Sequence, residues 1–477
     1  MVFSSLLFIF IFLPAALAFF YAGIFATRYN KNVFYISLTS LSLAFYFWGS
    51  GKMVLLLMAS ILLNWFIGKQ LVQSDSVGKK KSLLMVGIVM NLSALLYFKY
   101  CRFILDTLGL LAGTSLAPAL HPYLPVGISF YTFMTISYLV EMSRSPRQHA
   151  SLLEFGTYLS LFPHLVAGPI VRFSEIADDL RQRNSLTINN FYEGIVRFTQ
   201  GLGMKVLIAD NLSPMVDRIF LLDQSALTFG VSWLGALAYT FQIYFDFAGY
   251  SAMAIGLALM FGFHFPENFN QPYIAPSITE FWKRWHMTLS RWLRDYVYIP
   301  LGGNKKGNAR TYINLFTVFF ICGLWHGAAW TFVVWGLYQG LLLIFERAIK
   351  NNLGYEASGM AGIALTFLLT MVGWVVFRSE SFAQCGYFLH AMFSFSGGLT
   401  FACLYNQLGG YIDPLLMVCL AAAALFSFFP FEWVKTKVRY DGMVFLLGKT
   451  TAVAAMLFLA SLYAVGNSFK PFIYFRF

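Results

Sequence analysis

Long apolar runs separated by short polar turns set the pattern of this chain. Most of these runs approach the roughly 20 residues that a helix needs to cross the hydrocarbon of a bilayer. Because such runs recur from one end of the chain to the other, the pattern predicts an all-α polytopic membrane protein. The runs cover residues 2–26, 33–49, 53–67, 82–98, 126–140, 361–377, 415–429 and 443–465.

One polar and aromatic stretch, residues 268–303, interrupts this pattern. Ser277 and Glu280 have the spacing of a capping box, so we expect a helix to begin after Ser277 and to continue to Pro300. Its aromatic and cationic side chains fall on opposite faces, with His286 near the seam, which suits a helix lying along a membrane surface. An interfacial anchor without chemistry is the simplest interpretation. The cations of this stretch are Lys283, Arg284, Arg291 and Arg294.

Residues 313–345 contain no acidic or basic side chain except His326. As one helix these 33 residues would be about 50 Å long, whereas the hydrocarbon core is about 30 Å thick. We therefore expect a hairpin that turns at residues 323–327, where small residues allow a break. His326 should then lie deep in the protein, and an ionisable residue at such depth indicates a functional site.

Two further segments carry polar residues inside apolar sequence. Asp246 lies within residues 226–263, which hold enough apolar residues for two spans, and Gln242 precedes it by one helical turn. A cation from the following helix would make Asp246 structural, whereas a proton relay is the alternative. His164 lies in residues 159–173, a segment broken by Pro and Gly that we expect to be re-entrant, where it could line a cavity or cap the break. We take Gln242, Asp246 and His164 as candidate tunnel-lining residues.

Composition supports the membrane assignment. Of 477 residues, 58% are hydrophobic and 11% are charged, whereas soluble proteins carry about 25% charged residues. We attribute the net charge of +12 to basic loops retained on the cytoplasmic side, not to nucleic-acid binding. The five cysteines show no CxxC spacing, so we expect no metal site. The basic loops lie at residues 69–81, 144–147, 283–310 and 435–439.

Several motifs resemble one family, namely YFDFAGYS, ENFNQPYIAPSITEFWKRWHMTLSRWLRDYVYIPLGGN, GLWHG and PFIYFRF. In these motifs the chain is similar to the membrane-bound O-acyltransferase (MBOAT) superfamily, and most of all to its bacterial branch that acetylates alginate. The resemblance implies a single integral-membrane domain over residues 1–477, with a ring of helices and re-entrant segments around a central tunnel. It places the catalytic region at about residues 226–346, with His326 as the essential histidine and His286 as the second.

Members of this branch pass an acyl group from a cytoplasmic donor towards an extracytoplasmic polysaccharide, usually with a separate periplasmic or surface transferase. The resemblance thus implies an O-acetyltransferase of the bacterial inner membrane, with acetyl-coenzyme A (acetyl-CoA) as donor. The indirect acceptor would be an exported glycan such as alginate, cellulose or peptidoglycan. No Ser-His-Asp triad or GxSxG motif is visible in the sequence, which also favours a partner transferase.

Histidine suits acyl transfer because its ordinary pKa lies near neutrality. In this mechanism His326 accepts the proton of the nucleophile, and His286 positions the donor or the reacting carbonyl. Lys283, Arg284, Arg291 and Arg294 would attract the phosphates of the donor. Two alternatives stay open. In a transporter or channel, His326 and Asp246 would form a proton pathway, and in a scaffold subunit of an export complex the histidines would only be packed.

Overall fold

The computed structural model describes residues 2–114, 122–145, 149–182, 185–394, 413–429 and 442–466. Within these ranges every regular element is a helix, and seven helical stretches are long and apolar enough to cross a membrane. The predicted all-α polytopic class is therefore confirmed, whereas the ring and its tunnel stay predictions. The basic segment 435–439, part of 144–147 and the C-terminal PFIYFRF motif lie outside the described residues.

Helix α12 (Phe229–Met260) is a single helix of 32 residues. The expectation of two spans from residues 226–263 is therefore wrong. Its most apolar window is 94% buried inside the protein, so its length does not have to match the thickness of the hydrocarbon. The chain passes between its two compact units at three points, namely within α10 (Ile188–Gly203), within α12 and in the loop after α12. The first unit comprises Met1–Phe198 with Met253–Pro266, and the second comprises Thr199–Ala252 with Glu267–Phe477.

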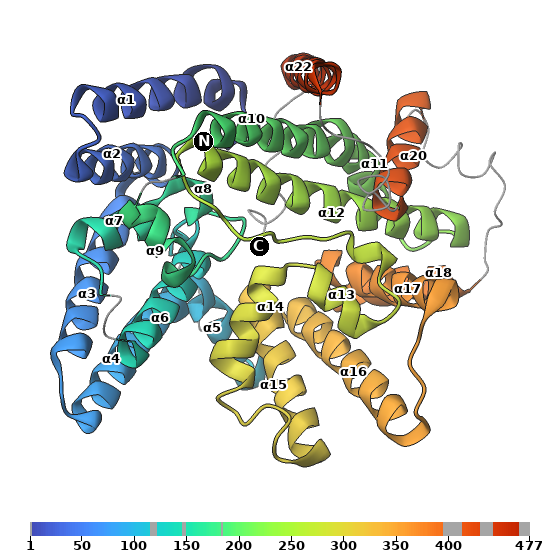
Figure 1. Cartoon of the computed structure of the whole chain (residues 1–477). Coiled ribbons are helices and arrows are strands. Elements are labelled where there is room, and N and C mark those ends of the chain that lie inside the picture. The colour runs from blue at the N-terminus through green and yellow to red at the C-terminus, as the bar shows by residue number, and fades with distance from the viewer. Residues whose placement is uncertain are drawn as a thin grey trace. The chain divides into compact units, whose positions relative to one another are not determined.

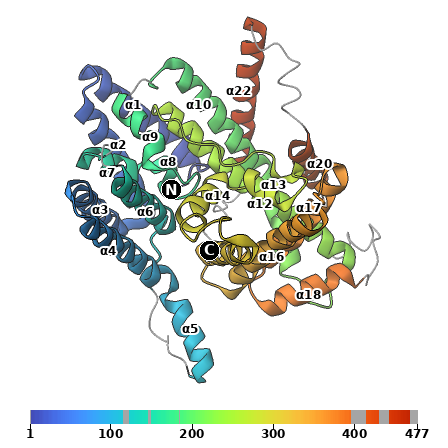
Figure 2. The same cartoon turned by 60° about the horizontal axis from the view of Figure 1, so that its bottom comes forward.

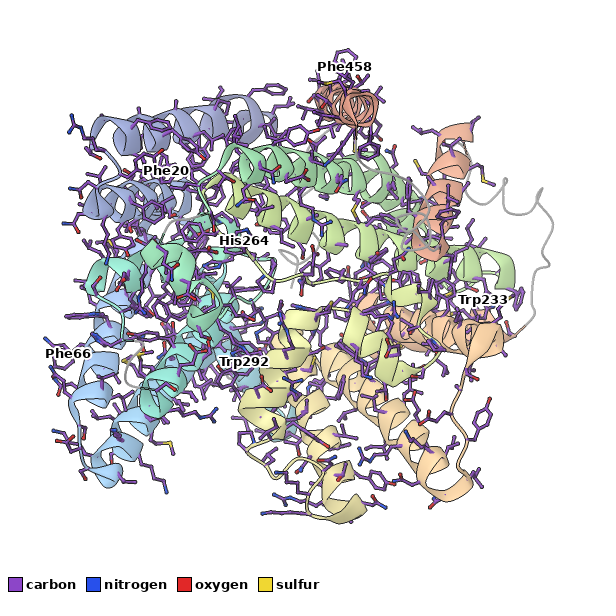
Figure 3. The ribbon with its side chains drawn as sticks, in the orientation of Figure 1. Phe20, Phe66, Trp233, His264, Trp292 and Phe458 are labelled. Atoms are coloured by element: carbon purple, nitrogen blue, oxygen red, sulfur yellow. The ribbon has the colours of Figure 1, made fainter. Side chains whose placement is uncertain are left out.

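The first unit contains helices that pack side by side. α3 (Val54–Gln73), α4 (Val77–Leu95) and α6 (Ile128–Arg144) lie against one another (Figures 1 and 2). Phe66 on α3 points outward and is 54% exposed (Figure 3), whereas α6 is almost entirely buried. Exposed apolar surface of this kind suits contact with lipid. The other helices of this unit are α1 (Leu13–Ala26), α2 (Lys31–Ser50), α5 (Cys101–Ala112), α7 (Leu152–Ser160), α8 (Phe162–Leu165) and α9 (Phe173–Gln182).

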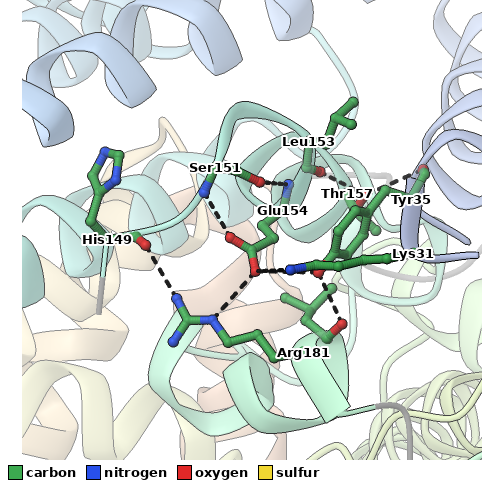
Figure 4. A network of polar contacts seen from close by, with 9 residues as sticks. Lys31, Tyr35, His149, Ser151, Leu153, Glu154, Thr157 and Arg181 are labelled. Atoms are coloured by element: carbon green, nitrogen blue, oxygen red, sulfur yellow. Dashed lines mark hydrogen bonds and ion pairs between the residues drawn. The ribbon is translucent and has the colours of Figure 1, made fainter. Parts of the chain in front are cut away.

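A buried carboxylate, Glu154, fastens α2, α7 and α9 of the first unit together (Figure 4). It accepts hydrogen bonds from the Ser151 main-chain N–H at 2.7 Å, the Tyr35 hydroxyl at 3.2 Å and Arg181 Nε at 3.3 Å. Lys31 adds an ion pair at 3.8 Å. Burial raises the pKa of Glu154, but these donors and cations lower it by more, so the carboxylate is ionised near neutral pH.

The second unit holds α15 (Gly307–His326), α16 (Trp330–Leu353) and α17 (Gly359–Arg378), which pack in sequence order (Figure 1). α22 (Met443–Gly466) leaves most of its side chains exposed, and Phe458 points away from the helix (Figure 3). An apolar helix that is so exposed suits a lipid environment. The other helices of this unit are α11 (Asp210–Phe220), α13 (Ile278–Arg284), α14 (Met287–Leu293), α18 (Phe382–Phe393) and α20 (Pro414–Phe428).

Glycines bring the two helices of the α15–α16 hairpin into backbone contact. A Cβ at Gly323 would lie 2.4 Å from the Phe332 main-chain oxygen, and one at Gly336 would lie 2.3 Å from the Phe319 main-chain oxygen. Only glycine leaves room for so close an approach. The turn follows directly after His326, so the predicted hairpin is confirmed.

Replacing Gly336 by Ala should destabilise the protein by about 1–3 kcal/mol, because the added methyl group meets backbone that cannot move aside. The measurement is the midpoint of thermal unfolding of the purified protein in detergent. Gly386→Ala in α18 is the matched control, since a Cβ there would meet nothing within 4 Å and the helix should be unaffected or slightly stabilised. Equal midpoints for Gly336→Ala and the wild type would contradict the close packing of the hairpin.

Candidate active site

Helix α13 begins after Ser277 as predicted, because the Ser277 hydroxyl accepts a hydrogen bond from the Glu280 main-chain N–H at 3.2 Å. However, α13 and α14 are separate helices, and His286 between them has left-handed backbone angles, with φ 43° and ψ 52°. The prediction of one continuous helix to Pro300 is therefore wrong. A left-handed conformation costs a residue with a Cβ about 1–3 kcal/mol, so neighbouring contacts must hold it in place.

Asn268 supplies those contacts from the loop before α13. Its main-chain oxygen accepts a hydrogen bond from the Met287 N–H at 2.9 Å. Its side-chain oxygen accepts bonds from the Thr288 N–H at 3.3 Å and from the Thr288 hydroxyl at 2.9 Å. In a continuous helix these N–H groups would bond to carbonyls of the preceding turn. The break is thus held by a residue 18 positions before His286.

Both histidines of the predicted site contact one tryptophan ring. The centroid of Trp325 lies 5.9 Å from that of His286 and 5.0 Å from that of His326. His326 also meets the rings of Trp335 at 5.0 Å and Phe377 at 5.3 Å. His286 is fully buried and His326 is 4% exposed. The structure therefore brings the two histidines together in an aromatic interior.

A pocket of about 860 Å³ lies between α13, α14, α15 and α16, a size typical of small-molecule sites. Its apolar lining reaches Cys322 on α15, which is one helical turn, or roughly 6 Å along the axis, from His326. Arg347 and Lys350 line it from α16. Because α15 and α16 are antiparallel, these two cations lie towards the opposite end of the pocket from Cys322. The apolar lining includes Trp282, Leu289, Leu293, Leu315, Val318, Phe319 and Leu343.

Three of the four cations predicted to bind the donor line this pocket, but all three have acidic partners. Glu280 pairs with Lys283 at 3.4 Å and with Arg284 at 3.0 Å. Arg294 pairs with the neighbouring Asp295 at 2.7 Å. Their charges are therefore partly neutralised within α13 and the π-helical turn after α14.

Arg347 is a pocket cation that the sequence analysis missed. It makes no hydrogen bond or ion pair to any described residue, whereas Lys350 pairs with Glu356. Arg347 comes just after the apolar run 313–345, and a cation at the end of such a run could have indicated it. Arg291 lies outside the pocket lining, so this geometry gives no support to the donor-binding role predicted for it.

Asp246 is buried in a cluster of ion pairs. Lys205 Nζ lies 2.8 Å from Asp246 and 2.6 Å from Asp210. A cationic partner exists, which favours the structural interpretation, but it precedes α12 in the chain, so the expectation of a partner from the following helix is wrong. Gly249 permits this approach, because a Cβ there would lie 2.7 Å from the Gly201 oxygen and 3.1 Å from the Lys205 nitrogen.

His164, in the first unit, caps the end of a helix. Its Nε2–H donates to the Tyr158 main-chain oxygen at 2.8 Å in the last turn of α7, and its ring stacks on Phe265 at 4.9 Å. The alternative that this histidine caps a break is therefore confirmed. Gln242, in the second unit, is 7% exposed on α12. A tunnel-lining role for either residue stays a prediction.

Comparison with known protein families decides which family the chain belongs to. Residues 78–355, more than half of the chain, match MBOAT, the membrane-bound O-acyltransferase family. The chain belongs to this family. It is therefore an O-acyltransferase and a multi-pass membrane protein, as its motifs predicted. The family favours acyl transfer over the transporter and scaffold alternatives.

Individual members of the MBOAT family are similar over the full length. The "Probable alginate O-acetylase AlgI" of Pseudomonas putida is 40% identical over 495 residues, covering 100% of both chains. The Pseudomonas aeruginosa protein of the same name is 44% identical over 401 residues, covering 83% of this chain and 75% of its own. The "Peptidoglycan O-acetyltransferase" of Helicobacter pylori is 33% identical over 522 residues, covering 100% of this chain and 98% of its own.

For an MBOAT enzyme, the arrangement offers imidazole nitrogens, an aromatic interior and a pocket with cations towards one end. Within the described ranges, no cluster of three or more His, Cys, Asp or Glu side chains could hold a metal ion. Imidazole nitrogens can accept and return a proton, and cationic side chains can bind an anionic group.

We expect both histidines to be required for acyl transfer. His326→Ala should lower the rate by a factor of about 10² to 10⁴, the usual effect of losing a general base. His286→Ala should also remove most of the activity, but less completely than His326→Ala. Both variants should reach the membrane near normal levels, and any shortfall should fall on His326→Ala. The measurement is ester acetate on the exported polymer together with protein level in the membrane fraction. His390→Ala, an exposed histidine of α18, is the control and should leave both unchanged.

Proposed function

We propose that this enzyme takes an acetyl group from a cytoplasmic thioester, most simply acetyl-CoA, for the O-acetylation of an exported polysaccharide. The observation that carries the proposal is the pocket. It extends from Arg347, which has no partner among the described residues, to Cys322, one helical turn before His326. The names of the full-length relatives, which refer to alginate and peptidoglycan, support an exported glycan as the final acceptor. An alginate-like polymer is the first candidate.

The chemistry assigned to His326 is that of a general base. The acceptor hydroxyl attacks the carbonyl carbon of the thioester while a nitrogen of His326 takes the hydroxyl proton. The tetrahedral intermediate then collapses, the C–S bond breaks, and the proton passes from His326 to the departing thiolate. An ester and a free thiol result, and His326 returns to its starting state.

The pocket matches an elongated donor with an anionic end and an apolar arm. Arg347 can offer charge-assisted hydrogen bonds to a phosphate, because no described acid competes for it. The aliphatic and aromatic lining along α15 suits the arm that carries the thioester. With the phosphate held near Arg347, the acyl end would lie towards Cys322 and thus beside His326.

A partner transferase on the outer side of the inner membrane would complete the reaction. Both histidines are buried, His286 completely and His326 with 4% of its surface exposed, which disfavours direct access by a long polymer chain. An acetyl group handed to a periplasmic or surface acetyltransferase would avoid this difficulty. The polysaccharide is then an indirect acceptor.

Arg347→Ala should raise the KM for the acetyl donor by about 10-fold, because a charge-assisted hydrogen bond contributes about 1.5–3 kcal/mol and 1.4 kcal/mol is a factor of ten. kcat should change little, since Arg347 is remote from His326. Lys283→Ala is the matched control. The Lys283 ammonium already forms an ion pair with Glu280, so the KM of this variant should shift by less than about 3-fold. Equal KM shifts for the two variants would remove Arg347 from the donor site.

The pocket should be reached from the cytoplasm. In a cysteine-free background, a cysteine replacing Lys305 should escape a membrane-impermeant thiol reagent in intact cells and react once the cells are opened. A cysteine replacing Lys52, in the turn between α2 and α3, should react in intact cells, because α3 separates this turn from the basic loop at residues 69–81, which we expect in the cytoplasm. Strong labelling at position 305 in intact cells would overturn the cytoplasmic placement.

The proposed function itself is tested by the fate of the donor. The purified chain, reconstituted in lipid, receives acetyl-CoA labelled in the acetyl group, with and without the partner transferase and polymer. We expect the thioester to be consumed only when an acceptor is present, and labelled ester to reach the polymer only with the partner. No consumption under any condition would contradict acyl transfer. Rapid acetylation of the polymer by the chain alone would contradict the need for a partner.

A further inference from the structure

The side-chain amide of Asn268 can adopt only one orientation. Its oxygen lies 3.3 Å from the Thr288 main-chain nitrogen, which is always a hydrogen-bond donor. A flipped amide would point its NH₂ group at this N–H, leaving two donors face to face. On its other side, the amide nitrogen donates to the Ser251 hydroxyl at 3.0 Å. The chemistry of its neighbours therefore fixes the Asn268 oxygen towards α14.

This orientation also fixes the proton on His286. His286 Nδ1 lies 3.2 Å from the same Asn268 oxygen, which can only accept, so Nδ1 carries the proton. In a neutral imidazole the other nitrogen then has a lone pair. His286 Nε2 is buried and has no hydrogen-bond partner among the described residues. A buried nitrogen with a free lone pair can accept a hydrogen bond from an N–H or O–H group of a substrate.

We propose that Asn268 is a positioning residue that holds His286 in the Nδ1–H tautomer, so that Nε2 accepts a hydrogen bond from an N–H group of the acetyl donor. This inference rests on the proposed function. Of the two roles predicted for His286, it excludes positioning of the reacting carbonyl, because a nitrogen lone pair repels the carbonyl oxygen. Positioning of the donor remains. The hydroxyl proton of the acceptor goes to His326, which leaves an amide N–H of the thioester arm as the group that fits.

The surroundings keep His286 neutral. Burial lowers the pKa of His286 to about 3. Its ring faces Phe247 of α12, Phe269 of the preceding loop and Trp325 of α15. The titratable or charged residues next along these elements and in the adjoining helices include Asp246, which is paired with Lys205, together with Glu267, His326, Arg284 and Arg291.

Asn268→Asp tests the role through the pH dependence of kcat/KM for donor consumption in membranes that contain the complete system. The carboxylate still accepts from Nδ1, but its negative charge raises the pKa of His286. When His286 is protonated its Nε2 can no longer accept a bond, so activity is lost as the pH falls. The wild-type profile gives the reference acid limb. Asn268→Asp should add a second, steepening the slope from one to two and moving the midpoint up by about 1 pH unit or more.

Two control variants separate this role from a structural one. Ser251→Ala loosens the same amide without adding charge, so it should keep a slope of one and the wild-type midpoint. Asn268→Leu removes the acceptor and should lower kcat/KM about 10-fold or more at every pH without moving the limb, the loss of a hydrogen bond worth about 1.5 kcal/mol. An Asn268→Asp profile that matches the wild type in slope and midpoint would overturn the proposal.

A second readout does not depend on turnover. Nitrogen-15 NMR of histidine-labelled protein in bilayers, with His286→Gln used to assign the signal, reports which ring nitrogen is protonated. We expect a protonated Nδ1 and an unprotonated Nε2 for His286. The opposite tautomer would overturn the proposal whatever the activity. If the wild type consumed no thioester, the proposed function would fail, and the NMR signal would still decide the tautomer.

Discussion

The hydrogen bonds from Asn268 to the start of α14 are the constraint on which the site depends. An interior with little water must satisfy its backbone groups within the protein, and these bonds replace those that a continuous helix would have made. Because the helix breaks here, α13 and α14 are separate helices, and both line the pocket together with the hairpin. Glu346 of α16 accepts the first N–H groups of α13, at 2.7 Å from Ile278 and 3.2 Å from Thr279, and so ties the break to that hairpin.

Features that depend on local sequence could be predicted. The start of α13 follows from Ser277, whose hydroxyl caps the helix. The hairpin follows from 33 uncharged residues around His326 that are too long for one span, and from the glycines that allow two helices to touch. The predicted catalytic pair came from a resemblance in motifs, since spacing alone does not bring His286 and His326 to the same tryptophan.

Features made by contacts between distant residues could not be predicted. Periodicity favoured one helix through His286, because the residue that breaks it lies 18 positions earlier. The sequence analysis expected the partner of Asp246 on the helix that follows α12, but Lys205 precedes α12 in the chain. Lys205 reaches Asp246 because Gly249 lets the backbone around residues 201–205 approach closely. Counting cations likewise cannot tell which of them are paired. Arg284 and Arg294 pair with acids, whereas Arg347 pairs with none among the residues that the structure describes.

The central claim is that one donor spans the pocket from Arg347 to His326, and an image of the bound donor tests it most directly. Cryo-electron microscopy of the full chain in lipid, with a non-hydrolysable acetyl thioester analogue at saturation, would locate both ends of the molecule. The account predicts phosphate density beside Arg347, continuous density along Val318 and Cys322 of α15, and the acetyl carbon within reach of His326. Density for the analogue outside this pocket, with the space along α15 unfilled, would contradict it.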